Sequence, residues 1–255
     1  MRYIDTHAHL GPWFDDITTF TAEEFVALQE RAGIERTVVS SGSALFTELV
    51  YGNEWTIQQA EKLDHLLVWL VLNPLKPTES SELLDKFKDH PKVVGIKIHP
   101  VLHKYPADIN ASFRLLERIE PLGLPVLSHG ENESYAAPAR LRRLAEGFPK
   151  MTVITAHFGA GQPGQTQDAI DAIQDCASGN LYTDMGTARA IRTGILGLMV
   201  RAVGAEKILF GTDSPLYEPM AFPTLLTAAD ITDEEREQIA HKNAERLVLG
   251  PSGLA

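Results

Sequence analysis

The chain has 255 residues, 44% of them hydrophobic and 22% charged, which is typical of a globular protein that buries a sizeable core. Its 34 acidic residues outnumber its 23 basic ones, and the net charge of −11 argues against a nonspecific binder of nucleic acid or of anionic membranes. The single cysteine, Cys176, excludes an intrachain disulfide and a cysteine-based zinc site.

Short apolar runs predict eight β-strands at regular intervals along the chain. They begin near residues 2, 36, 66, 93, 125, 152, 181 and 207. Each run is rich in Val, Ile and Leu on both faces, as expected of a parallel strand that helices cover on the outside.

Helical patterns fill the intervals between these runs. A capping box at Thr21–Glu24 predicts the start of a helix that Gly33 ends. A second capping box, at Thr232–Glu235, predicts a C-terminal helix that continues to Gly250.

The alternation of strands and helices predicts an α/β fold, a (β/α)8 TIM barrel with a C-terminal capping helix. A barrel of this kind typically needs about 250 residues, so we expect residues 1–255 to form a single domain. An open, doubly wound sheet is the second choice. It would carry a glycine-rich phosphate turn after the first strand, where this chain has THAHLGPW.

Reactive side chains fall at the ends of these strands. His7 and His9 end the first, and the fourth, fifth, sixth and eighth end at His99, His129, His157 and Asp213. In a parallel barrel all these ends lie on the C-terminal rim, where active sites are built. The other histidines are expected at the surface or at helix caps: His65, His90, His103 and His241.

The spacing of these residues predicts that they meet. Side chains two apart on a strand share a face, so His7 projects with His9, and Lys97 with His99. Barrel closure brings the eighth strand beside the first, and with it Asp213. Imidazoles with one carboxylate suit Zn²⁺, and also Mn²⁺, Fe²⁺ or Co²⁺, and such an ion can lower the pKa of a bound water to near 7.

Each residue also has a structural interpretation. A lone histidine at a strand end is commonly a hydrogen-bonded structural residue, Asp213 suits an Asx turn before Pro215, and Lys97 could be paired inside the rim. Four strands that deliver histidines and a fifth that delivers an aspartate to one face favour a metal site instead.

The ordered motifs DTHAH, GIKIHP, PVLSHG, ITAHFGAG and LFGTDSP resemble those of the amidohydrolase superfamily, in its amidohydrolase-related branch. The resemblance extends from residue 3 to about residue 249. It implies that His7, His9 and Asp213 bind a divalent metal, for which Zn²⁺ is the first expectation and Mn²⁺ or Fe²⁺ the alternatives. His129 would be a further ligand. His157 would bind a second ion, or act as a base or electrophile beside the bound water, and Asp213 would take a proton from that water.

Lys97 leaves the number of ions open. In binuclear amidohydrolases a lysine at a comparable place on strand 4 is carboxylated and bridges two metals, whereas many members of the related branch hold one. We expect one ion, with two as the alternative. TatD-like nucleases are similar in outline but carry a glutamate at this place, so we do not expect a nuclease.

The expected function is a metal-dependent hydrolase of a small ester, lactone, amide or related bond. The alternative is a metal-dependent decarboxylase, a C–C lyase that acts on an unsaturated or aromatic carboxylic acid, with Arg189 to bind the carboxylate. Short loops after the strands favour the hydrolase. A non-catalytic, metal-binding barrel is a third interpretation.

The partners follow from the same features. We expect a small-molecule substrate, no nucleic acid and no membrane, and we leave a homodimer open. Because the first residues suit a strand better than a signal peptide, and because Asn73 and Pro74 interrupt the longest apolar run, we expect a cytoplasmic protein. The expected pocket walls are Trp13, Phe14, 43–46, Tyr105, 131–135, 158–162 and Tyr217.

Overall fold

The computed structural model describes residues 1–13, 20–131, 135–159 and 166–250. Its strands form one sheet in sequence order, with every neighbouring pair parallel, and this confirms the predicted (β/α)8 barrel. The strands are β1 (Tyr3–Leu10), β2 (Ile34–Ser41), β3 (Leu66–Val71), β4 (Val93–Ile98), β5 (Val126–Ser128), β6 (Val153–Thr155), β7 (Leu181–Asp184) and β8 (Ile208–Leu209).

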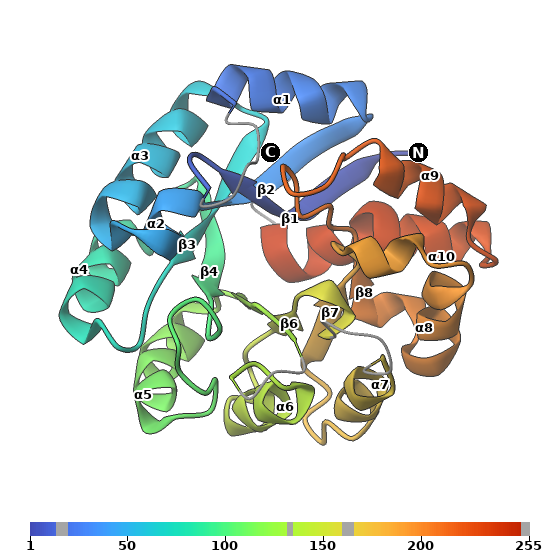
Figure 1. The fold of residues 1–255 in the computed structure, drawn as a ribbon. Helices are drawn as coiled ribbons and strands as arrows, with labels where there is room; N and C mark the ends of the chain where they lie inside the picture. The colour runs from blue at the N-terminus through green and yellow to red at the C-terminus, as the bar shows by residue number, and fades with distance from the viewer. Residues whose placement is uncertain (14–19, 132–134, 160–165, 251–255) are drawn as a thin grey trace.

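Helices surround this sheet on the outside, as Figure 1 shows. They are α1 (Ala22–Arg31), α2 (Gly42–Phe46), α3 (Leu49–Lys62), α4 (Pro77–Phe87), α5 (Asn110–Ile119), α6 (Pro138–Gly147), α7 (Thr166–Gln174), α8 (Ile195–Val203), α9 (Ala221–Ala228) and α10 (Asp233–Glu237). Both predicted capping boxes are present, at the starts of α1 and α10. Gly33 follows α1 with a φ of 76°, a left-handed value that glycine adopts without strain.

The barrel closes where β1 meets the segment after β8. The Thr6 amide donates to the Phe210 carbonyl at 2.9 Å, and the Asp213 amide donates to the His7 carbonyl at 2.7 Å. One step further along, the His9 amide donates to the Ser214 carbonyl at 2.7 Å. These bonds join the first strand to the segment after the eighth and set Asp213 beside His7 and His9.

Side chains inside the barrel alternate with those that face the helices. Trp69 on β3 is fully buried, and its indole Nε1 donates to the Thr6 carbonyl at 2.8 Å. Gly95 on β4 makes room for that ring, because a Cβ at this position would stand 2.2 Å from Trp69 Cζ3. This apolar layer fills the barrel away from the carboxyl ends of the strands, where the polar residues lie.

The C-terminal helix closes the barrel on the side opposite the histidines. The helical path continues from α10 through Gln238–Lys242 and Glu245–Leu249, both with wide π-type turns. Ala244 and Val248 belong to the same apolar cluster as Ile4 and Leu67 from the strands. The predicted capping helix is therefore confirmed. Among the described residues, none of the helices is both long enough and apolar enough to cross a membrane.

Candidate metal centre

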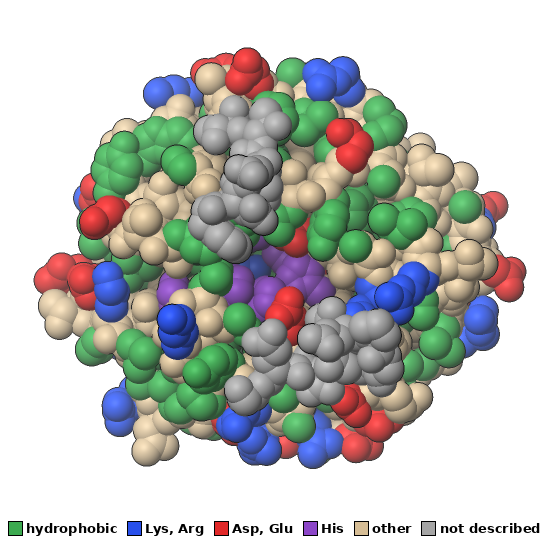
Figure 2. Space-filling view, in the orientation of Figure 1, with side chains coloured by type: hydrophobic (Ala, Val, Ile, Leu, Met, Phe, Trp, Pro, Cys, Tyr) green, Lys and Arg blue, Asp and Glu red, His purple; other side chains and the backbone are tan. Residues whose placement is uncertain are grey.

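A hollow lies at the centre of the barrel face that carries the carboxyl ends of the strands. Figure 2 shows histidine side chains gathered in this hollow, with acidic and basic atoms among them. Most of these side chains are buried, although they are polar, and buried polar groups need partners. The partners they find define what the site can do.

His7 stands at the centre of the cluster. Its Nδ1 lies 2.9 Å from Asp184 Oδ2, and its Nε2 lies 3.1 Å from Lys97 Nζ and 3.5 Å from Asp213 Oδ1. Burial and the neighbouring Lys97 charge lower the pKa of His7 to about 4. The imidazole is therefore neutral at pH 7, which is the form that binds metal ions.

His9 projects from β1 beside His7, as the alternation of strand side chains predicts. The two ring centroids lie 5.4 Å apart. His9 Nε2 lies 3.0 Å from Asp213 Oδ1, and Nδ1 lies 2.8 Å from the hydroxyl of Ser40 on β2. Burial lowers the pKa of His9 as well, so both histidines of the motif are neutral at pH 7.

Asp213 follows β8 and has a φ of 56°, a left-handed conformation that costs energy for a residue with a side chain. A buried carboxylate below it, Asp5, supports this turn: Asp5 accepts the Thr212 amide at 3.1 Å and the Thr212 hydroxyl at 2.6 Å. Burial acts to raise the pKa of Asp213, but the imidazoles of His157, His7 and His9 hold it well below its usual range. Asp213 is therefore an anion that faces three histidines.

His157 lies directly after β6 in a left-handed turn. Its φ is 65°, and Phe158 and Gly159 follow with 56° and 65°. The His157 amide donates to Asp184 Oδ1 at 3.2 Å, and Nδ1 donates to the Gly186 carbonyl at 2.5 Å. These bonds aim the ring at the cluster, where Nδ1 lies 3.9 Å from Asp213 Oδ2.

His129 occupies the edge of the cluster, after β5. Its Nδ1 lies 3.3 Å from His157 Nε2, and its Nε2 lies 3.3 Å from Glu131 Oε1. His99 stacks on His129 with a centroid separation of 3.9 Å. Burial lowers the pKa of His129 to about 4 and that of His99 well below its usual value.

Lys97 is fully buried on β4 and points at His7. Burial lowers the pKa of Lys97 to about 8, against the charges of Asp184 and Asp213, which act to raise it. The amine is thus mostly protonated at pH 7 and donates to the Nε2 lone pair of His7. An ion bound by that lone pair would have the Lys97 amine as its immediate neighbour.

These contacts bring every predicted site residue into one connected cluster. Within it, His7, His157 and Asp213 each offer one ligand atom, and these atoms all lie within 4.8 Å of one another. One carboxylate and two imidazoles at this separation form a group that can hold a divalent ion. His9 joins the group through Asp213, whereas His129 reaches it only through His157.

Asp184 and Ser40 are functional candidates that the sequence analysis missed. Asp184 ends β7 in the run LYTDMG, so the strand-end rule that selected the histidines applies to it as well. Burial acts to raise the pKa of Asp184, but His7 and the Gly186 amide outweigh it and hold the pKa at about 2. Ser40 carries no such signal, because serine is common in strands and its role comes from the register between β1 and β2.

The remaining predictions concern the walls of the pocket and the four histidines outside the site. Trp13 packs against the His9 ring at 4.5 Å, as a pocket wall would. Phe14, residues 132–134 and residues 160–162 lie outside the described part of the chain. The four remaining histidines lie outside the cluster, with partners of their own: Thr37 for His65, Glu61 for His90, the Leu45 carbonyl for His103 and Glu245 for His241.

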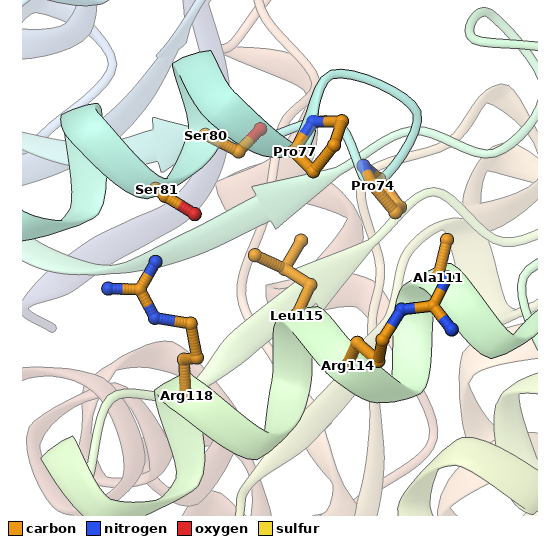
Figure 3. A pocket seen from close by; sticks show the side chains of 8 residues that line it. All are labelled: Pro74, Pro77, Ser80, Ser81, Ala111, Arg114, Leu115 and Arg118. Carbon is orange, nitrogen blue, oxygen red and sulfur yellow. The ribbon is translucent and has the colours of Figure 1, made fainter.

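A separate cavity of about 240 Å³ lies between α4 and α5, away from the histidines. In Figure 3, Arg114 and Arg118 of α5 flank Leu115, and Pro74 and Pro77 stand opposite. Arg118 is paired with Asp85 of α4 at 2.8 Å. None of the residues that line this cavity belongs to the histidine cluster.

Comparison with known proteins gives a family and a fold. The family model described as amidohydrolase matches residues 4–249. A dihydroxybenzoic acid decarboxylase of Polaromonas sp. JS666 with bound manganese superimposes with a TM-score of 0.76, at 16% identity, over 96% of each chain. An Acinetobacter baumannii protein named for 2-pyrone-4,6-dicarboxylic acid hydrolysis, with citric acid bound, gives 0.68 at 16% identity, over 97% of this chain and 99% of that one.

Several other similar solved structures are decarboxylases by name, and one from Staphylococcus aureus is named as an amidohydrolase. Among curated proteins, an acetate kinase of Campylobacter fetus subsp. fetus (strain 82-40) is 25% identical over 243 residues, which are 91% of this chain and 52% of that protein. The chain therefore spans about half the length of that relative.

Proposed function

Because the chain belongs to the amidohydrolase family, we propose that it is a metal-dependent hydrolase that cleaves a small ester, lactone, amide or related bond with an activated water. The observation that carries the proposal is the convergence of His7, His157 and Asp213 within 4.8 Å on the active rim of a barrel. A cytoplasmic location and a single domain stay expectations from the sequence.

The donor set fits a divalent ion in its chemistry as well as in its spacing. Burial keeps His7 and His9 neutral, and Asp213 adds one negative charge. We propose Zn²⁺, which favours imidazole with carboxylate, and Mn²⁺ as the alternative, since manganese is bound in the Polaromonas decarboxylase. His129 is proposed as a further ligand, and its contacts with His157 and Glu131 would then rearrange.

The reaction assigns roles to the residues of the rim. A bound divalent ion would supply Lewis acidity, which makes water nucleophilic near neutral pH. Asp213, held as an anion, accepts the proton of the attacking water at Oδ2 and passes it to the leaving group. His157 donates from Nδ1 to the Gly186 carbonyl, so its Nε2 lone pair is the atom that would bind the ion or act as a base beside the attacking water.

Decarboxylation is the second candidate, and Arg189 is the observation that favours it. The residue is 7% exposed and lies after β7, in a short turn where its amide donates to the Thr187 hydroxyl at 3.2 Å. Burial lowers the pKa of Arg189, and the carboxylate of Glu131, which lies near His129, acts to raise it. An arginine on the rim after β7 suits a substrate carboxylate, and several structurally similar proteins are named for decarboxylating aromatic acids.

A substrate panel separates the two reactions. The Zn²⁺- or Mn²⁺-loaded protein is given lactones, esters, amides and phosphoesters, and in parallel aromatic carboxylic acids with CO₂ release as the readout. We expect hydrolysis, and we expect Asp213→Asn to reduce it by at least 100-fold while the exposed Asp85→Asn control retains it. CO₂ release with no hydrolysis would replace the proposal with the decarboxylase. A decarboxylase would in addition show a raised KM in Arg189→Met and an unchanged KM in the exposed control Arg201→Met.

A further inference from the structure

Asp184 is buried with no exposed surface, and both of its carboxylate oxygens contact residues of the site. Oδ2 lies 2.9 Å from His7 Nδ1. Oδ1 accepts the Gly186 amide at 2.8 Å and the His157 amide at 3.2 Å. One side chain on β7 therefore joins a histidine of β1 to the histidine that follows β6.

The contact with His7 selects one tautomer of that ring. An ionised carboxylate only accepts hydrogen bonds, so the proton of the neutral imidazole must sit on Nδ1. Nε2 then carries no proton, so it accepts from Lys97 Nζ at 3.1 Å in the metal-free chain, and it lies 3.5 Å from Asp213 Oδ1. This unprotonated nitrogen is the one on the side where the candidate ligand atoms converge.

The contact with the His157 amide acts on the backbone. His157 and Phe158 both have left-handed φ values, which are unfavourable for residues with side chains. Such a turn persists only when its surroundings determine it. The Asp184 carboxylate holds it from inside the barrel, and the fully buried Phe158 ring anchors it in the core.

We propose that Asp184 is a positioning residue of the metal centre: it fixes His7 as the Nδ1–H tautomer, so that Nε2 is free for the ion, and it holds the His157 turn at the same time. Carboxylates that orient metal-binding histidines in this way typically contribute 10–100-fold in metal affinity. The proposal rests on the metal centre proposed above.

Asp184→Asn tests it in the full-length chain. The amide oxygen can still accept the two backbone amides, but the NH₂ group would face His7 Nδ1. His7 must then move its proton to Nε2, which blocks the lone pair, or lose the contact. We expect calorimetric titration of the metal-stripped protein to show Zn²⁺ bound 10–100-fold more weakly than by the unsubstituted chain. Circular dichroism at the same temperature should show the protein still folded.

The matched control is Asp108→Asn, which also removes a paired carboxylate, but one that faces Arg140 and Arg143 on α6. It should bind Zn²⁺ as the unsubstituted chain does. An Asp184→Asn protein that is folded and binds Zn²⁺ with unchanged affinity would overturn the proposal. If the unsubstituted chain binds no Zn²⁺, the proposed function fails instead, so the two failures are distinct.

A second measurement does not depend on how the variant folds. ¹⁵N NMR of the histidine rings in the metal-free, unsubstituted chain, with the His7 signals assigned by their loss in His7→Gln, reports which nitrogen carries the proton. We expect the Nδ1–H form for His7. An Nε2–H form would overturn the proposal, because the Asp184 carboxylate could then not be setting the ring.

Discussion

At the scale of single residues, the site combines imidazoles, the carboxylates of Asp184 and Asp213, and one buried ammonium, that of Lys97. His7 lies between two of these charged groups, 3.1 Å from Lys97 Nζ and 3.5 Å from Asp213 Oδ1. The ammonium neutralises part of the charge of Asp184 and Asp213 in the absence of a metal. A divalent ion would repel it, so Lys97 opposes metal binding unless it is carboxylated.

Lys97→Met distinguishes a free Lys97 amine from a carboxylated one. Methionine keeps most of the volume and removes the charge, so with one ion and a free amine we expect Zn²⁺ to bind at least tenfold more tightly. At about 4 Å and an effective dielectric constant of about 20, two unit charges interact by about 4 kcal/mol. Elemental analysis with calorimetry measures the number of ions and their affinity. If a carboxylated Lys97 bridges two ions, the variant would instead lose one of them.

The sequence predicted the histidines and Asp213 because a single rule, the strand end, selects them. The same rule also applies to Asp184, but this residue forms no motif with a neighbouring residue in the chain. Its partner His7 is 177 residues away. The role of Ser40 depends on the pairing of β1 with β2, and strand register is fixed by packing that one sequence does not display.

At the scale of elements, the C-terminal helix is tied to the barrel by a buried asparagine. Asn243 Nδ2 donates to the Ala205 carbonyl at 2.8 Å and to the Ile208 carbonyl at 2.6 Å. The second of these is at the start of β8, the strand that leads to Asp213. The helix therefore stabilises the start of β8, the last strand of the barrel.

Asn243→Ala should lower the free energy of unfolding by about 1–3 kcal/mol, because it removes two buried hydrogen bonds at about 0.5–1.5 kcal/mol each. Urea denaturation followed by tryptophan fluorescence measures the change. The control is Lys242→Ala, which removes an exposed ion pair with Glu237 and should cost no more than about 0.5 kcal/mol. Equal effects of the two substitutions would contradict the assigned role of Asn243.

The elements themselves were predictable because local sequence determines them. Both capping boxes are satisfied within four residues, and the apolar runs coincide with the observed strands to within a few residues. The wide turns of the C-terminal helix and the left-handed residues His157, Phe158 and Asp213 were not predicted. Their conformations depend on distant partners, such as Asp184 for His157.

At the scale of the whole molecule, the barrel turns a dispersed set of residues into one site. Side chains more than 200 positions apart, His7 and Asp213, meet because the first strand closes on the segment after the eighth. The apolar layer and the C-terminal helix fill the opposite end, so the polar residues are confined to one rim. The fold alone does not name the substrate, since similar folds belong to proteins named for hydrolysis and for decarboxylation.

If His7, His157 and Asp213 hold a divalent ion, calorimetric titration of the metal-stripped chain with Zn²⁺ should show one ion bound per chain. In Asp213→Asn, binding should weaken by more than the roughly 10–100-fold expected of a residue that only positions a ligand. No binding by the unsubstituted chain, or equal binding by the folded variant, would contradict this metal site.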